Sequence, residues 1–362
     1  MEKLTKNPAA AGSRRSFLKK SMVAGAVATV GTGFLSNGLS KLAHASTSPA
    51  KLSDGDIAIL QFVAAAEIIE TDLWQQYAEL GGIGAKNPYA NAFLNLDGDG
   101  QQYITSNTLD EHSHAAFLDA YLASKGAPQV NLSKFATLPS SKAKGARQIG
   151  RLTSLMQLTV DTSWYIRYRS KQSPDFGATF PQAVTIADKP AIPLTNADFG
   201  PTDHVQALAD TAAFHFGTIE QGGSSLYSAM VQKASNLEVL QVLVSIGGDE
   251  VAHFLEWVDF AGNAASAPLA PLTDPVTGLF IPDLNASGSP LTQTNLIFPV
   301  PCQFINQSLP VCAVIRPTDP TGIAAGVVTF LTEMGLFIGQ STEFFDTLNA
   351  LAAAADAAQR SC

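Results

Sequence analysis

Two segments of the sequence share the pattern Glu-x-x-His within a stretch of helical periodicity. Glu111 and His114 lie in "DEHSHAAFL", and Glu250 and His253 lie in "GGDEVAHFLEW". Residues three apart project from one side of a helix, and in both segments that side also carries apolar residues. The pattern therefore predicts an acid and an imidazole on the buried face of two helices. Such groups are costly to bury unless their charge is compensated.

Two further predicted helices each place a single acid on their apolar face. Glu67 lies seven residues before Trp74, and Glu220 lies seven residues before Tyr227. Each acid thus shares its face with an aromatic residue two turns further on, and Trp74 and Tyr227 are expected to lie next to the acids. Glu70 is an alternative to Glu67, because it is one turn away on nearly the same face.

The order of these residues along the chain is an acid, Glu-x-x-His, an acid, and Glu-x-x-His. This set is the ligand constellation of four-helix proteins with a di-iron or di-manganese site, and one long central crossover is the ferritin-like topology. Two divalent cations would neutralise the four converging carboxylates. A histidine for each ion favours iron or manganese over calcium. The predicted metal ligands are Glu67, Glu111, His114, Glu220, Glu250 and His253.

These motifs resemble the ferritin-like superfamily, specifically the exported ferritin-like proteins of the desiccation-related type. The segment "AAAEIIETDLW" approximates the first-helix pattern of that type, and the other three helices carry its E-x-x-H, E…Y and E-x-x-H motifs. The resemblance covers about 55–125 and 203–262. Leu73 and Trp74 stand where the type usually has Phe-Tyr, so a redox role for a tyrosine there is not implied. The resemblance implies the fold and the site rather than a particular reaction.

The fold predicted is all-α, a ferritin-like four-helix bundle over 55–262 with added segments. Helical periodicity predicts the four bundle helices at about 55–80, 101–125, 203–234 and 236–263. The inserted crossover, 127–202, is expected to include a helix at 145–171.

The remainder, 263–362, is predicted to be a Pro-rich excursion followed by C-terminal helices. Ten prolines fall between 264 and 320, which favours an ordered irregular segment with a short hairpin. Cys302 and Cys312 flank a ten-residue step there and are the candidate disulfide, although connectivity with Cys362 is open.

The N-terminus predicts export. "SRRSFLKK" contains Arg14 and Arg15, a mildly apolar Gly/Ala-rich run follows, and "AHA" precedes Ser46. This is the pattern of a twin-arginine signal peptide, 1–45, cut after Ala45. The run is too short and glycine-rich to be a good membrane anchor. We therefore expect a periplasmic or extracellular protein with no stable membrane span after cleavage.

The net charge argues against two classes of partner. The whole chain has a net charge of −9, and without residues 1–45 it has 15 basic and 30 acidic residues, a net charge of −15. Such a surface disfavours nucleic acid and anionic membranes and tolerates cations. The sequence gives no oligomeric state.

The expected function is redox chemistry at a di-iron or di-manganese centre, with O₂ or H₂O₂ as the small-molecule substrate, in stress protection. Glu111 and Glu250 would bridge or chelate the ions, and Glu67 and Glu220 would be terminal ligands. His114 and His253 would be the nitrogen ligands. The alternative is a non-catalytic, stress-protective protein with no essential metal. Iron storage is a third possibility, which the added segments disfavour.

Overall fold

The structure is a computed structural model, and it describes residues 51–170, 180–294, 301–315 and 318–361. These described residues belong to one compact unit. The predicted signal peptide and Cys362 lie outside the described residues.

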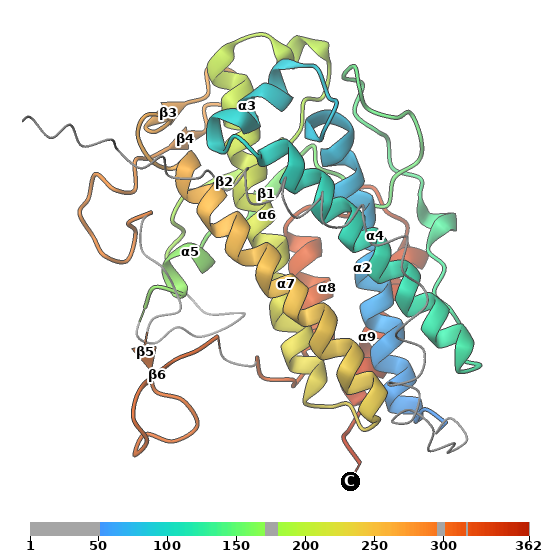
Figure 1. Cartoon of the computed structure of the whole chain (residues 1–362). Coiled ribbons are helices and arrows are strands. Elements are labelled where there is room, and N and C mark those ends of the chain that lie inside the picture. The colour runs from blue at the N-terminus through green and yellow to red at the C-terminus, as the bar shows by residue number, and fades with distance from the viewer. Residues whose placement is uncertain (1–50, 171–179, 295–300, 316–317, 362) are drawn as a thin grey trace, which may run out of the picture. The chain divides into compact units, whose positions relative to one another are not determined.

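Four long helices form the framework of this unit and confirm the predicted bundle. They are α2 (Asp54–Gly81), α4 (Gly100–Ser124), α6 (Thr202–Val231) and α7 (Leu237–Ala264). The helix α2 packs along α4, and α6 packs along α7 (Figure 1). Each pair is joined by a short connection, whereas the chain from α4 to α6 is long. The sequence patterns placed every one of these helices to within three residues at each end.

The connection between α2 and α4 holds a further helix beyond the four bundle helices that the sequence patterns predicted. The helix α3 covers Pro88–Leu96. The side chain of Asn87 accepts a hydrogen bond from the Ala90 amide, and Pro88 occupies the first helical position. Both are helix-start signals, so the short segment carried the information for a helix that its glycine-rich and polar flanks obscured.

The crossover from α4 to α6 corrects the predicted helix at 145–171. Its backbone is mostly irregular, and one carboxylate oxygen of Asp72 on α2 accepts from the amides of Leu152 and Thr153 at 3.0 and 2.9 Å. These bonds occupy two amides that a helix over 145–171 would need for its own backbone hydrogen bonds. The regular elements of the crossover are η1 (Ser133–Phe135), β1 (Leu158–Val160), α5 (Trp164–Arg167), β2 (Ile186–Lys189) and η2 (Asn196–Phe199), with β1 and β2 antiparallel.

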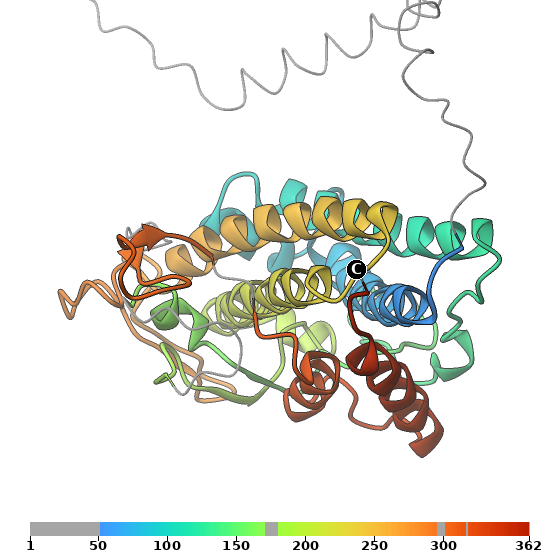
Figure 2. The same ribbon diagram turned by 90° about the horizontal axis from the view of Figure 1, so that it is seen from below.

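The C-terminal helices form a pair, α8 (Ile323–Glu333) and α9 (Thr342–Ala357). Figure 2 shows this pair on one side of α2 and α6, with α4 and α7 on the opposite side. The helix α6 is thus enclosed, and nearly all its residues are buried, including polar ones. Among the described residues, no helix combines the length and the apolarity that a bilayer span requires.

The Pro-rich segment forms two short antiparallel hairpins. One pairs β3 (Leu272–Thr273) with β4 (Phe280–Ile281), and the other pairs β5 (Pro301–Cys302) with β6 (Cys312–Ala313). Cys302 lies directly opposite Cys312 across the second ladder. The two sulfurs are not joined by a disulfide in the structure. A disulfide between Cys302 and Cys312 therefore stays a prediction, which their cross-strand placement favours.

Candidate metal centre

The six predicted ligands meet in the interior of the bundle. Glu67 comes from α2, Glu220 from α6, and the two Glu-x-x-His pairs from α4 and α7, and all six residues are buried. Their ligand atoms form two overlapping groups, and within each group the atoms lie within 4.8 Å of one another. The first group is Glu67, Glu111, His114 and Glu250, and the second is Glu111, Glu220, Glu250 and His253. Glu111 and Glu250 belong to both groups, as bridging carboxylates would.

Both imidazoles turn Nδ1 toward the carboxylates. The Nδ1 of His114 lies 3.4 Å from an oxygen of Glu67 and 3.4 Å from one of Glu111. The Nδ1 of His253 lies 3.1 Å from an oxygen of Glu111 and 3.4 Å from one of Glu220. Two atoms that each bind one ion at about 2.1 Å in octahedral geometry lie about 3 Å apart. These separations therefore suit an ion held between the groups.

The opposite ring nitrogens bind two aspartates that we did not predict. The Nε2 of His114, on α4, donates to Asp249 of α7 at 3.2 Å, and the Nε2 of His253, on α7, donates to Asp110 of α4 at 3.4 Å. Each carboxylate fixes the tautomer and the ring orientation of the other helix's histidine, leaving Nδ1 for a metal. A signal was present, because an aspartate directly precedes the glutamate in both motifs.

Two further side chains orient the carboxylates. The amide of Asn107 donates to Glu111 at 2.8 Å and to Glu220 at 3.0 Å, and its oxygen accepts from the indole of Trp257 at 2.6 Å. Asn107 lies one turn before Glu111 in the sequence. This spacing alone did not indicate that Asn107 would hold two carboxylates. The hydroxyl of Tyr227 donates to Glu67, so Tyr227 lies beside the site as expected.

Glu70 and Trp74 lie close to the site but outside both ligand groups. Burial, and then the charge of Glu111, raises the pKa of Glu70 well above its ordinary range. Trp74 is fully buried and stacks on Trp257 with ring centroids 5.3 Å apart. The structure therefore assigns Glu67, and not Glu70, to the ligand groups, and it places Trp74 in the aromatic packing around them.

The carboxylates lack the compensation that burial demands. Burial, and then the charge of Glu220, raises the pKa of Glu111 to about 8, and burial followed by the charge of Glu111 raises the pKa of Glu250 well above its ordinary range. Both oxygens of Glu250 are buried without a hydrogen-bond partner, as is one oxygen of Glu67. Buried polar atoms are almost always satisfied. Orphaned oxygens in a set of carboxylate and imidazole donors fit a site for metal cations.

A glycine provides the space for this arrangement. A Cβ atom at Gly223 of α6 would overlap the Oε2 atom of Glu250, whereas one at Gly222 would meet no atom within 4 Å. The close approach of α6 to α7 at this level thus requires a residue without a side chain.

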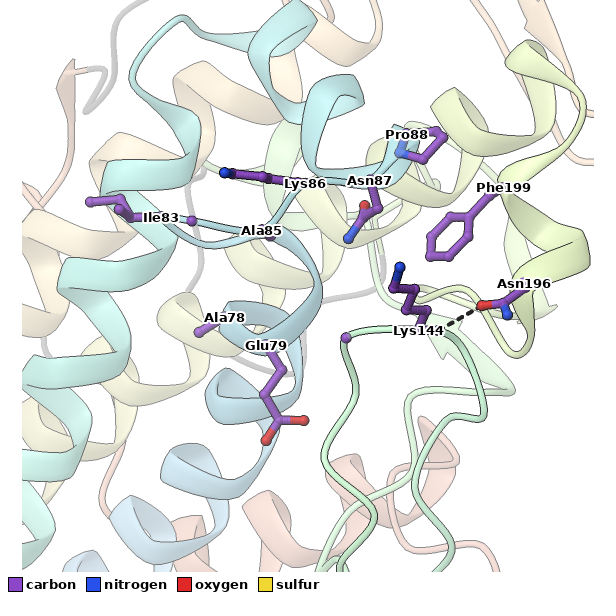
Figure 3. Close-up of a pocket in the computed structure, with 12 residues that line it drawn as sticks. Ala78, Glu79, Ile83, Ala85, Lys86, Asn87, Pro88, Lys144, Asn196 and Phe199 are labelled. Carbon is purple, nitrogen blue, oxygen red and sulfur yellow. Dashed lines mark hydrogen bonds between the residues drawn. The ribbon is translucent and has the colours of Figure 1, made fainter.

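A surface cavity of about 600 Å³ lies elsewhere, at the C-terminal end of α2. Figure 3 shows Glu79, Lys86, Lys144 and Phe199 among the residues around it. Glu79 forms an ion pair with Arg151. None of the six predicted ligands lines this cavity, so it is separate from the carboxylate site.

A comparison with protein families shows what the chain is similar to. The model of a family described as a ferritin-like domain matches residues 55–256, more than half of the chain. The comparisons with curated proteins and with solved structures found no match. The chain therefore belongs to the ferritin-like family, and the matched range contains all six residues of the two ligand groups.

Proposed function

We propose that this member of the ferritin-like family binds two ions of iron or manganese and uses them in redox chemistry with O₂ or H₂O₂. The observation that carries the proposal is the pair of overlapping ligand groups that share Glu111 and Glu250. Four carboxylates carry a charge of −4 when ionised, which two divalent cations would balance. The remaining donors are imidazole nitrogens, a set that suits iron or manganese.

The six side chains would each have a defined role in holding the two ions. Glu67 with His114 would hold one ion, Glu220 with His253 would hold the other, and the two shared carboxylates would bridge them. A pair of redox-active ions supplies electrons to O₂ or peroxide two at a time. Burial keeps bulk water out, and the aspartates and Asn107 fix the donors in advance, so little reorganisation is needed when the ions bind.

The approach to the site is acidic. The side chains of Asp110 and Asp249 are nearly half exposed, at 46% and 45%, while the imidazoles that they contact are almost buried. A cation arriving from solvent would thus meet two carboxylates at the edge of the site before it meets the buried ligands. This arrangement supports exchange of ions with the surroundings.

Metal titration followed by peroxide addition tests the proposal. We expect the metal-free protein to bind about two Fe²⁺ or Mn²⁺ ions per chain, and the loaded protein to consume H₂O₂ faster than the free ions do. A protein that binds no metal and melts at the same temperature with and without chelator would contradict the proposal. That result would instead favour the non-catalytic, stress-protective function.

We also infer that the protein is exported in folded form and acts in oxidative or desiccation stress. The support is the twin-arginine pattern at Arg14 and Arg15 and the resemblance to exported desiccation-related proteins. N-terminal sequencing of the exported chain should begin at Ser46. An Arg14→Lys/Arg15→Lys variant should remain inside a bacterial host, and its undiminished export would contradict this inference.

A further inference from the structure

A continuous aromatic cluster begins at the carboxylate site. The indole of Trp257 donates to Asn107, which in turn donates to Glu111. Trp257 stacks on Trp74 at 5.3 Å between centroids, and Trp74 lies 5.9 Å from the ring of Tyr77. All three of these aromatic residues are fully buried. Electrons move readily between aromatic rings in such contact, so the cluster connects the site with Tyr77.

The hydroxyl of Tyr77 forms a hydrogen bond to a base, the imidazole of His215. Its hydroxyl donates to the Nδ1 atom of His215 at 2.7 Å, and the Nε2 atom of His215 donates to the sulfur of Met334 at 3.2 Å. Thioether sulfur only accepts, so the imidazole carries its hydrogen on Nε2 and presents a bare Nδ1 to the phenol. Burial lowers the pKa of His215 to about 3 and raises the pKa of Tyr77 well above its ordinary range. The pair is therefore a neutral phenol on a neutral base.

No such base accompanies another fully buried tyrosine of the bundle, Tyr89. Its hydroxyl donates to the backbone carbonyl of Ala191 at 2.6 Å. A carbonyl oxygen accepts a hydrogen bond but not a proton, so oxidation of Tyr89 would have to expel its proton into an apolar interior. Tyr77 can instead pass its proton along an existing hydrogen bond.

The far end of this chain of contacts reaches the surface. Met334, just after α8, lines a cavity of about 740 Å³ that Pro181 and Phe330 also line. The lining is mixed, because it also includes Asp161 and Glu333. Apolar side chains beside hydrogen-bonding ones suit a small neutral aromatic molecule with hydroxyl groups better than an anion. The cavity lies on the opposite side of His215 from Tyr77, because the two ring nitrogens of His215 contact Met334 and Tyr77 separately.

From this geometry we infer that Tyr77 and His215 form a one-electron relay between the metal site and this cavity. The inference rests on the proposed function, which supplies the oxidant: the metal site after reaction with O₂ or peroxide. Tyr77 gives one electron to that site by way of Trp74 and Trp257, and its phenolic proton moves to Nδ1 of His215. A small phenol or hydroquinone in the cavity then returns one electron through Met334. The proton goes back to the Tyr77 oxygen, and the donor releases its own proton to solvent.

Photo-oxidation of the metal-free protein tests the relay without the metal site. The partly buried Tyr103 and Tyr121, and Tyr227, whose hydroxyl donates to the Glu67 carboxylate, would first be changed to Phe. A laser-excited ruthenium complex with an electron acceptor would generate the oxidant. We expect electron paramagnetic resonance to show a tyrosyl radical that Tyr77→Phe abolishes and Tyr89→Phe leaves unchanged. His215→Gln keeps a hydrogen-bonding side chain but not the base, and it should lower the radical yield at least tenfold. A radical that survives Tyr77→Phe, or a yield unchanged in His215→Gln, would overturn the inference.

The outer end has its own test. Hydroquinone should shorten the lifetime of the Tyr77 radical, and Ala187→Trp, which fills the cavity from its exposed rim, should reduce that acceleration severalfold. Equal acceleration in both proteins would contradict entry of the donor through the cavity. Metal content is measured separately, so a protein that forms the radical but binds no metal would contradict the proposed function and leave the Tyr77–His215 pair supported.

Discussion

At the scale of single residues, the carboxylate site depends on the absence of a side chain at Gly223 as well as on the carboxylates and imidazoles themselves. The Glu250 carboxylate occupies the space into which a Cβ atom at Gly223 would project. Glycine in the middle of a helix is unfavourable by about 1 kcal/mol relative to alanine, so this residue has a cost that its site offsets. Glu250 belongs to both ligand groups, and its displacement would affect both ions.

Gly223→Ala should therefore lose most of its bound metal while the fold persists. The matched control is Gly222→Ala, because a Cβ atom there meets nothing within 4 Å and the change should raise stability by about 1 kcal/mol. Metal per chain and the melting temperature of both variants measure these effects. Full metal occupancy in Gly223→Ala would contradict the assignment of Glu250.

The pKa shifts at the site predict how the metal-free protein responds to pH. Burial raises the pKa of Glu111 from an ordinary 4.5 to about 8. Burial alone would lower the pKa of His114, but hydrogen bonds to Glu111 and Glu67 raise it from 6.5 to about 10. Both groups bind more protons in the folded state than in the unfolded state, so the free energy of unfolding should fall as pH rises.

Thermal melts of the metal-free protein at several pH values should show this trend. The acid begins to destabilise the fold above pH 4.5 and does so fully near pH 8, and the stabilisation from the imidazole is lost between 6.5 and about 10. Glu111→Gln should flatten the fall between pH 4.5 and 8. Stability that rises over this range in the metal-free protein would contradict the shifts.

Residue types and their spacing predicted the six residues that converge in the bundle, but the groups around them were harder to foresee. Asp110 and Asp249 were visible as a repeated Asp-Glu-x-x-His, although nothing in one helix shows that its aspartate contacts the other helix's histidine. The role of Asn107 depends on three helices at once, because it joins Glu111 on its own helix to Glu220 and Trp257 on two others.

At the scale of elements, periodicity located the bundle helices and failed in the crossover. The helices α2, α4 and α7 bury one face, so the pattern of that face is readable in the sequence, whereas α6 is buried on nearly all sides. The segment before β1 instead takes its conformation from Asp72, a residue about 80 positions away. Contacts of that kind leave no local pattern, which explains why a helix was wrongly expected there.

The helix α8 offers a test of such long-range contacts. Its N-cap residue, Gly322, supplies no side-chain cap, and the carboxylate of Asp356 on α9 accepts from the amides of Ala324 and Ala325, each at 3.0 Å. An acid at a helix N-terminus satisfies free amides and complements the helix dipole. One helix of the pair is thus capped by the other.

Asp356→Ala should lower the free energy of unfolding by about 1–2 kcal/mol. Asp346→Ala is the control on the same helix, because Asp346 is exposed and should change stability by less than about 0.5 kcal/mol. Denaturant titration measures both values. Equal effects of the two substitutions would contradict the capping role.

At the scale of the whole molecule, the folded part is organised around a set of buried charges. Acids from all four bundle helices converge where a hydrophobic core would otherwise continue, and α8 with α9 shields the opposite side of α2 and α6. Bound cations would balance these charges without protonation of the acids. Chelator should therefore lower the melting temperature of the metal-loaded protein, and added Fe²⁺ or Mn²⁺ should restore it.

The most direct test of the central claim is the number of metal ions per chain in the double variant Glu111→Gln/Glu250→Gln. Elemental analysis should find about two ions per chain in the natural protein and almost none in the variant, which should remain folded because two of its four converging buried carboxylates are replaced by neutral amides. Asp259→Asn, an exposed position on α7, should keep both ions. Equal metal content in the natural protein and the double variant would contradict the claim that these carboxylates form a di-metal site.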